Sequence, residues 1–274
     1  MRLGIAPPLS GRDRPVPPTA EQLAATAALI ERLGFDSLWT FDSISRGFIL
    51  PDPLTAIAVA AASTKRIELG TGVLQVPLRR PVELAHRVLT VHALSSGRLV
   101  LGVGAGSTAQ DFEAVGVDFT KRMALMDEAL GVMRRLWRGE KVGAAALEPW
   151  PSTLGGPPVL IGSWAGSRWI PRAATEFDGW VGSGARSTGA KLEQGIKRFR
   201  AAGGTRAIAT NIHADLSASN ELLDPDGPFH LRCNAADAAE RLRWLAGLGF
   251  DEAVLVPRAA DEATLGPLRA LLSR

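Results

Sequence analysis

The chain has 274 residues, one cysteine, no tyrosine and a formal net charge of +3 from 31 basic and 28 acidic residues. One cysteine excludes a disulfide scaffold and a cysteine-based metal cluster, and the lack of a basic stripe argues against a nucleic-acid partner. The uncharged apolar stretch at residues 53–64 is too short to cross a bilayer, and the N-terminus carries no apolar run of signal-peptide length. We therefore expect a globular, cytoplasmic protein with no membrane partner.

Short apolar runs alternate with amphipathic stretches along almost the whole chain. The runs predicted as strands cover residues 3–6, 37–41, 66–73, 99–103, 159–161, 179–181, 207–214 and 252–256. The stretches predicted as helices cover residues 19–33, 53–62, 81–95, 122–138, 188–202, 235–248 and 261–273, with a short helix between residues 161 and 179. Strands separated by helices indicate parallel βαβ units.

Eight such units predict a single α/β domain over residues 1–274, a (β/α)8 TIM barrel. We expect its largest irregular pieces, residues 139–158 and 215–233, as insertions after the fourth and seventh strands. An open doubly wound sheet is the alternative, because periodicity does not count strands reliably. Length alone also fits two smaller domains, so the prediction of one domain depends on the strand count.

Several helix starts carry capping signals. Thr19 with Gln22 three positions later is a capping-box pattern. Asp52 precedes a proline at the first helical position, and Asn234 is placed to cap the helix that follows it. These signals support the helix starts at residues 19, 53 and 235.

The predicted carboxyl ends of the strands, where a barrel places its active site, are short of catalytic side chains. They offer one clear carboxylate, Asp42, and one histidine, His213, among many glycines, small hydroxyls and tryptophans. Glycines allow close backbone approach and tryptophans supply apolar walls. This set suits the binding of a flat cofactor that performs the hard chemistry. Ordinary βα turns are the alternative.

Other kinds of site lack their signatures. The run from Gly102 to Ser107 has serine where the dinucleotide-binding fingerprint needs its third glycine. His86 and His92 are six residues apart on one predicted helix, so they face roughly opposite sides and do not share a metal. The serines at the strand ends do not sit in G-x-S-x-G. We expect no metal site and no serine hydrolase.

Several strings resemble the bacterial luciferase-like monooxygenase family. They are LGFDSLW at residues 33–39 followed by Asp42, RIELGTGV at 66–73, LSSGRLVLGVGAG at 94–106, GVDF at 116–119, and the stretch 173–180. The similarity is dense over residues 30–182 and loose after residue 205. The resemblance implies a (β/α)8 barrel that binds FMN or the deazaflavin coenzyme F420 at the strand ends.

The same resemblance implies roles for individual residues. Asp42 would lie beside the cofactor ring or the substrate, a cis peptide between Gly72 and Val73 would support the ring, and Gln75 would reach a polar ring edge. The remaining expected contacts are Ala105, Gly106 and Gln110 on the ribityl side, Ala165 and Gly166 at the phosphate, and Trp39 and Trp164 as walls of the substrate pocket.

One departure from the family pattern concerns catalysis. Many members carry histidine directly after the aspartate that corresponds to Asp42, and this chain has Ser43. Serine has no pKa near neutrality, so it does not replace the acid–base work of a histidine. The expected catalytic set is therefore Asp42 and Ser43 with His213, unless hydride moves directly between donor, cofactor and acceptor.

These features predict an oxidoreductase or monooxygenase, a flavoprotein or F420 enzyme that acts on a small organic substrate. The choice between FMN and F420 stays open. With FMN, a flavin reductase is an expected partner, and the resemblance implies a homodimer. A non-catalytic flavin-binding protein on the same fold is the alternative. A barrel hydrolase or lyase ranks last, because the five lysines fall away from the predicted strand ends.

Overall fold

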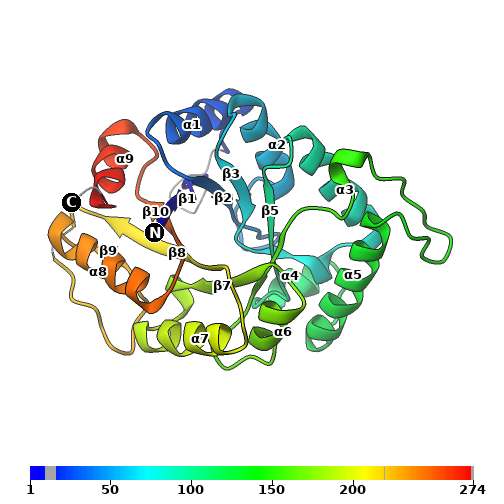
Figure 1. Cartoon of the computed structure of the whole chain (residues 1–274). Coiled ribbons are helices and arrows are strands. Elements are labelled where there is room, and N and C mark those ends of the chain that lie inside the picture. The colour runs from blue at the N-terminus through cyan, green and yellow to red at the C-terminus, as the bar shows by residue number, and fades with distance from the viewer. Residues whose placement is uncertain (10–16, 219, 273–274) are drawn as a thin grey trace. The chain divides into compact units, whose positions relative to one another are not determined.

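The structure is a computed structural model that describes residues 1–9, 17–218 and 220–272. Its parallel strands are β1 (Arg2–Ile5), β2 (Ser37–Thr40), β3 (Glu68–Thr71), β5 (Leu99–Gly104), β6 (Val159–Gly162), β7 (Gly179–Ser183), β8 (Ala207–Asp215) and β10 (Glu252–Pro257). In hydrogen-bonding order the sheet runs β10-β1-β2-β3-β5-β6-β7-β8, and β10 also pairs with β8. This order of eight strands returns to its start, which confirms the expected (β/α)8 barrel (Figure 1).

The helices alternate with these strands. They are α1 (Ala20–Arg32), α2 (Pro53–Ser63), α3 (Pro81–Leu94), α4 (Ala109–Ala114), α5 (Arg122–Trp137), α6 (Trp169–Thr175), α7 (Gly189–Ala201), α8 (Ala235–Leu248) and α9 (Glu262–Arg269). Single 3-10 turns lie at Val76–Leu78, Phe119–Lys121, Pro151–Thr153, Gly184–Arg186 and Ala270–Leu272. Residue 273, the last of the predicted final helix, lies outside the described residues. No helix in the described part of the chain is both long and apolar enough to span a membrane.

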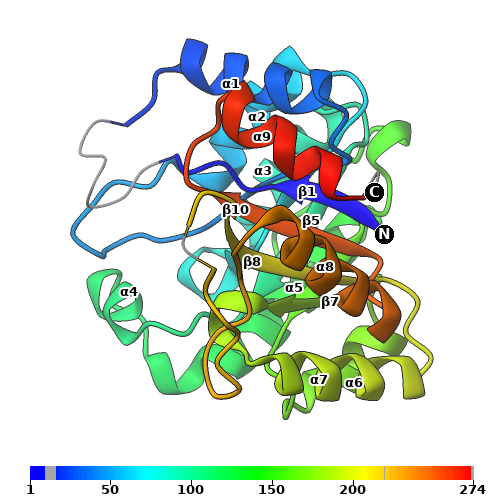
Figure 2. The same cartoon turned by 90° about the vertical axis from the view of Figure 1, so that its left-hand side faces the viewer.

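The chain forms two compact units. Unit 1 comprises Met1–Pro8, Ala25–Trp39 and Val159–Arg274, and unit 2 comprises Leu9–Ala24 and Thr40–Pro158. Within unit 1, β1 pairs with β10 over four residues and β10 pairs with β8, which Figure 2 shows side by side. Within unit 2, β3 pairs with β5 from Leu69 opposite Leu99.

The capping signals form the contacts that their residue types predict. The Thr19 hydroxyl accepts from the Gln22 N–H at 3.2 Å, and the Gln22 side chain accepts from the Thr19 N–H at 2.9 Å. The Asp52 carboxylate accepts from the Thr55 N–H at 2.9 Å, with Pro53 at the first helical position. These contacts satisfy N–H groups that have no partner inside the helix.

Three elements were not predicted, and all three are short. The expected strand at 66–73 ends at Thr71, and the two-residue strand β4 (Leu74–Gln75) follows and pairs with β5. Helix α4 has six residues, and β9 (Leu231–Arg232) pairs with the end of β8 inside the expected insertion. A strand of two residues or a helix of six contains too few positions for a hydrophobic period to appear.

Each unit has its own aromatic core. In unit 1, the fully buried Trp180 of β7 lies 6.1 Å from Phe199 of α7 and 5.6 Å from Phe250, between ring centroids. In unit 2, the buried Trp137 at the end of α5 donates its indole N–H to the Ala85 carbonyl of α3 at 3.1 Å. These contacts pack the helices of each unit against one another and against their strands.

Candidate functional site

Asp42, the one predicted carboxylate at the strand ends, is bound on both oxygens. Its Oδ2 accepts from the Gln75 N–H at 2.8 Å and from Arg79 Nη1 at 2.6 Å, and its Oδ1 accepts from Arg79 Nη2 at 2.9 Å. The Asp42 side chain is 2% exposed and that of Arg79 10%. A bidentate guanidinium contact of this kind is strong and directional. Asp42 therefore holds the Gln75 backbone and Arg79 in place and has no free oxygen for general-base work.

The ion pair continues outward to the N-terminus of α2. Arg79 Nη2 lies 3.7 Å from Asp52 Oδ2, and Arg87 of α3 reaches Asp52 Oδ1 at 2.9 Å. Burial alone would raise the pKa of Asp52, but the Thr55 N–H and hydroxyl, Arg87 and Arg79 hold it below its usual value. Burial alone would lower the pKa of Arg79, but Asp42 and Asp52 raise it above its usual value. Asp52 and Arg79 are therefore both charged at neutral pH.

A second buried carboxylate, Asp111 of α4, lies beside the first. It accepts from Arg46 Nη2 at 2.7 Å, from the Ser45 N–H at 3.2 Å and from Gln75 Nε2 at 3.2 Å. Burial alone would raise the pKa of Asp111, but the hydrogen bonds from Arg46, Gln75 and Ser45 hold it below its usual value. Asp111 is therefore an anion that ties α4 to the segment after β2.

These contacts determine the orientation of the Gln75 amide. Its Nε2 donates to the Asp42 carbonyl at 3.3 Å and to Asp111 Oδ2 at 3.2 Å, both of which only accept. The buried Oε1 has no hydrogen-bond partner among the described residues. It lies against Gly106, where a Cβ would come within 2.7 Å of both Oε1 and the Phe112 ring. Gly106 also has φ +83°, so it is glycine for two reasons.

The other predicted residues of unit 2 lie after strands β2, β3 and β5 and on α4. The peptide bond between Gly72 and Val73 is cis, as the resemblance implies, and the Gly72 N–H donates to the Thr40 carbonyl at 2.8 Å. The Ser43 hydroxyl oxygen is buried and without a partner in the described part of the chain. Ala105 is buried after β5, and Gln110 is exposed on α4. The structure thus brings Asp42, Gln75 and Gly106 together, and Gly72 and Val73 directly precede β4, which contains Gln75.

The predicted residues of unit 1 do not form one group. Trp164 is exposed on the turn before α6, and Ala165 on the same turn accepts a hydrogen bond from Arg198. Gly166 faces open space. His213 is exposed on β8. Desolvation and, to a smaller extent, the charge of Arg232 lower its pKa, so the imidazole is neutral at pH 7.

Trp39, expected as a pocket wall, lies in the core of unit 1. It is fully buried, and its indole N–H is shared between the Ser37 hydroxyl at 2.7 Å and Glu252 Oε1 at 3.1 Å. The Ser37 hydroxyl also donates to Glu252 Oε1. Both partners stand at the beginnings of their strands, β2 and β10, the end of a barrel that serves stability. This position gives Trp39 no exposed surface with which to form a pocket wall.

The family follows from a comparison with protein-family models. The model described as luciferase-like monooxygenase matches residues 1–262. The chain belongs to this family.

Curated relatives match this luciferase-like chain over part of its length. Limonene 1,2-monooxygenase from Rhodococcus erythropolis is 38% identical over 114 residues, which is 41% of the chain and 30% of that protein. The F420-dependent glucose-6-phosphate dehydrogenase of Beutenbergia cavernae is 36% identical over 137 residues, 45% of the chain and 40% of that protein. The aligned part is thus less than half the length of these relatives.

Solved structures share the fold over nearly the whole luciferase-like chain. The monooxygenase RslO1 from Streptomyces bottropensis aligns with a TM-score of 0.78 at 17% identity, covering 99% of this chain and 98% of its own. The oxygenating constituent of 3,6-diketocamphane monooxygenase from Pseudomonas putida, solved with FMN, aligns with a TM-score of 0.77 at 17% identity, covering 100% and 97%. At these identities the likeness establishes the fold.

Sequence reasoning missed three charged residues of the candidate site, Arg79, Asp111 and Arg46. Arg79 directly follows the 3-10 turn Val76–Leu78, Asp111 is on the short helix α4 and Arg46 is in a loop, so no spacing links them. One signal in the sequence could have identified Arg79. A buried Asp42 requires a cationic partner, and Arg79 is the nearest arginine after Gln75.

Proposed function

We propose that the chain is an oxidoreductase that uses FMN or F420 to transfer hydride to or from a small organic substrate. Family membership over residues 1–262 supports this proposal. So do the relatives, which are named as monooxygenases and as F420-dependent dehydrogenases. Nothing in these names favours a non-catalytic binding protein. Both cofactors remain candidates, because the relatives and structural neighbours include flavin- and F420-dependent proteins.

The observation that carries the proposal is the oriented Gln75 amide. Its Oε1 is a buried acceptor without a partner among the described residues, and such a group costs about 1–3 kcal/mol. Both candidate cofactor rings carry an N–H that can satisfy it. Because Gly106 covers the oxygen, we expect the turn at residues 105–107 to shift when the ring binds. The residues of unit 2 therefore fit a ring with a hydrogen-bond donor at its edge.

In this proposal Asp42 and Arg79 are positioning residues. They fix the backbone of Gln75, and Asp111 fixes its amide. The cofactor, when bound, would supply the hydride chemistry. The neutral imidazole of His213 is the candidate proton acceptor, and the Ser43 hydroxyl is a candidate donor toward substrate. The assignment of Ala165 and Gly166 to the cofactor phosphate stays a prediction.

Two partners belong to the proposal. With FMN, a separate reductase would supply the reduced flavin. One relative, from Acinetobacter baylyi, is named as the oxygenase component of a flavin-dependent trigonelline monooxygenase, which supports this arrangement. A homodimer, implied by the resemblance, stays a prediction that light scattering would test.

The test is a pair of binding titrations. Absorbance or fluorescence titration with FMN and with F420 is expected to give a dissociation constant in the micromolar range for one of them. Gln75→Leu, which keeps the volume and removes the acceptor, is expected to weaken that binding about tenfold, the worth of one hydrogen bond. Gln194→Leu, at an exposed position of α7, is the matched control. Failure of both cofactors to bind at about 1 mM would overturn the proposal.

A substrate panel completes the test. Turnover of the bound cofactor with any of a set of alcohols, aldehydes, ketones and alkenes is the expected result. Tight binding without turnover across the panel would favour the non-catalytic alternative instead.

A further inference from the structure

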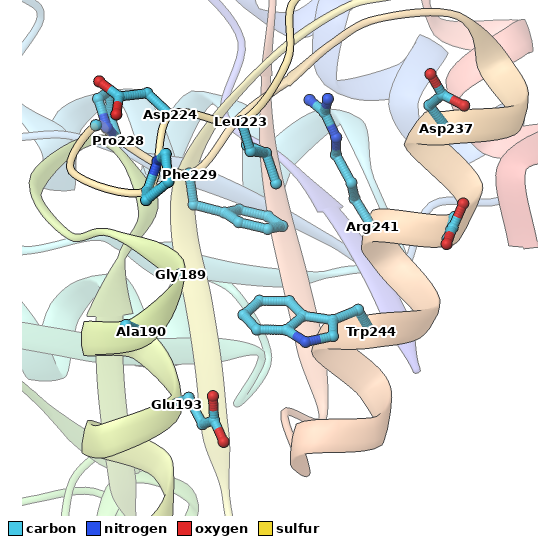
Figure 3. Close-up of a pocket in the computed structure, with 13 residues that line it drawn as sticks. Gly189, Ala190, Glu193, Leu223, Asp224, Pro228, Phe229, Asp237, Arg241 and Trp244 are labelled. Carbon is cyan, nitrogen blue, oxygen red and sulfur yellow. The ribbon is translucent and has the colours of Figure 1, made fainter.

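Unit 1 contains a cavity of about 540 Å³ that none of the predicted site residues lines (Figure 3). Its walls come from the first turns of α7, from α8 and from the segment 223–229 that connects β8 to β9. A volume of this size is in the range of small-molecule sites. The segment is anchored, because the Phe229 N–H is shared between the Gly184 and Ser187 carbonyls at 3.1 Å each.

One wall of the cavity is a stacked aromatic pair. The rings of Phe229 and Trp244 lie 5.5 Å apart at an interplanar angle of 24°. Phe229 is fully buried, and Trp244 of α8 remains 38% exposed. The edge of the Trp244 indole meets α7 at Gly189, where a Cβ would come within 3.3 Å of it. The exposed indole is therefore held in one orientation and offers a π surface to the cavity.

The charged groups around the cavity are mostly carboxylates. Four of them line it, on Glu193, Asp224, Asp237 and Glu240. Asp237 accepts hydrogen bonds from the side-chain amides of Asn220 and Asn234, which are neutral and do not offset a negative charge. Among the residues that the structure describes, Glu193 alone of these four has an ion-pair partner, since the exposed Lys197 reaches it from one turn along α7 at 2.5 Å.

The positive groups around the cavity contribute less charge than the four carboxylates. The Arg241 guanidinium also lines the cavity, but it donates to the Glu221 carbonyl at 2.6 Å and the His230 carbonyl at 3.1 Å, so it serves to hold the loop. The N-terminus of α7, at Gly189 and Ala190, contributes about half a positive charge. Four carboxylates outweigh the Arg241 guanidinium, the Lys197 ammonium and half a charge, so the cavity as a whole is negative.

We infer that this cavity binds a small organic cation with an aromatic or apolar body, whose cationic group lies over Trp244. Tryptophan is the best aromatic partner for a cation, and a negative rim raises the local concentration of cations. The inference is independent of the flavin or F420 site, because it uses residues of α7, α8 and their connecting segment alone.

The experiment is calorimetric titration of the full chain with three benzyl compounds that differ in charge. Benzyltrimethylammonium is expected to bind about tenfold more tightly than neutral benzyl alcohol or anionic phenylacetate, with an affinity that falls as sodium chloride is raised. Trp244→Leu and the double variant Glu193→Gln/Glu240→Gln are each expected to weaken binding of the cation about fivefold. Trp150→Leu, at a tryptophan of unit 2 that is 59% exposed, is expected to leave it unchanged.

Other outcomes would overturn the inference. These are equal or tighter binding of phenylacetate, no binding of the cation below about 10 mM, or unchanged affinity in both the tryptophan and the carboxylate variants. Glu240 is exposed and Glu193 half-buried on helix surface, so the carboxylate variants keep the test decisive even if Trp244→Leu lowers stability. Circular dichroism of each variant confirms that it is folded. Loss of FMN and F420 binding would leave this result unaffected.

Discussion

At the scale of single residues, Asp42 and Arg79 form a buried ion pair in unit 2. Two almost fully buried charges stabilise the fold only as a pair, because removal of one leaves the other unpaired in a low-dielectric surrounding. We expect Arg79→Met to lower the free energy of unfolding by about 3–5 kcal/mol. Urea denaturation followed by circular dichroism measures this loss.

A double variant separates the pair from its surroundings. Asp42→Asn/Arg79→Met removes both charges, so we expect it to be more stable than Arg79→Met alone by at least about 1 kcal/mol. A double variant that is less stable than the single one would show that Asp42 has a further charged partner that matters more. The exposed pair of Arg172 and Glu176 on α6 offers a contrast, since Glu176→Gln there is expected to cost less than about 1 kcal/mol.

Gly106 permits a second prediction at this scale. Gly106→Ala combines an unfavourable φ of +83° with a clash against Gln75 and Phe112, so we expect a loss of about 2–4 kcal/mol. Gly116→Ala is the matched control, because its φ is +68° and nothing lies within 4 Å of the added Cβ. Its expected loss is about 1 kcal/mol. Equal losses in the two variants, measured by thermal unfolding, would contradict the proposed close contact.

How far the sequence predicts single residues depends on what their role requires. The family motifs pointed to Gly106 and to the Gly72–Val73 bond. A positive φ and a cis peptide bond depend on particular residue types, and these residue types belong to the motifs. The partners of Asp42 and Gln75 were not found, because an ion pair across 37 positions and a hydrogen bond across 36 leave no local pattern. Trp39 was expected to form a pocket wall, and only its contacts with Ser37 and Glu252 reveal its place in the core.

At the scale of elements, glycines decide how closely helices pack. Gly195 on α7 faces Trp180 of β7, and a Cβ there would come within 2.4 Å of the indole. Gly247 on α8 has nothing within 4 Å of an added Cβ. We expect Gly195→Ala to destabilise the protein by about 1–3 kcal/mol through overpacking, and Gly247→Ala to stabilise it by up to about 1 kcal/mol through helix propensity.

The two glycine variants make identical chemical changes in helices of one unit. Their melting temperatures are therefore expected to move in opposite directions from that of the wild type. A rise for both would mean that α7 adjusts its distance from β7 at little cost, and that Trp180 does not restrict the packing.

The elements that sequence reasoning found were those long enough to carry a pattern. All eight barrel strands and the long helices were predicted, because apolar runs and amphipathic periods extend over them. The two-residue strands β4 and β9 and the six-residue α4 were missed. Two of these, β4 and α4, position Gln75 and Asp111, so the least predictable elements carry part of the candidate site.

At the scale of the whole molecule, three histidines link stability to pH. Burial lowers the pKa of His92, and desolvation and nearby arginines lower those of His213 and His230. The unfolded chain therefore binds more protons than the folded one just below the unfolded histidine pKa of about 6.5. We expect the free energy of unfolding to fall as the pH drops from 7.5 to about 5. Carboxylates with lowered pKa, such as Asp52 and Asp111, extend the fall below about pH 4.

His92→Leu tests this dependence. His92 is buried in α3, and each such histidine contributes up to about 1.4 kcal/mol per pH unit in this window. The variant is therefore expected to lose less stability than the wild type between pH 7.5 and 5 in urea titrations. His86→Gln, at an exposed position of the same helix, serves as the control. A pH profile of His92→Leu that runs parallel to that of the wild type would contradict the prediction.

The pairing of β1 with β10 has a consequence for how the protein is made. One edge of β1 meets Glu252–Leu255, about 250 residues later in the chain. During synthesis this edge stays open until Glu252–Leu255 has left the ribosome, and an open strand edge can pair with a neighbouring nascent chain. We therefore expect a chaperone that shields β1 to raise the yield of native protein.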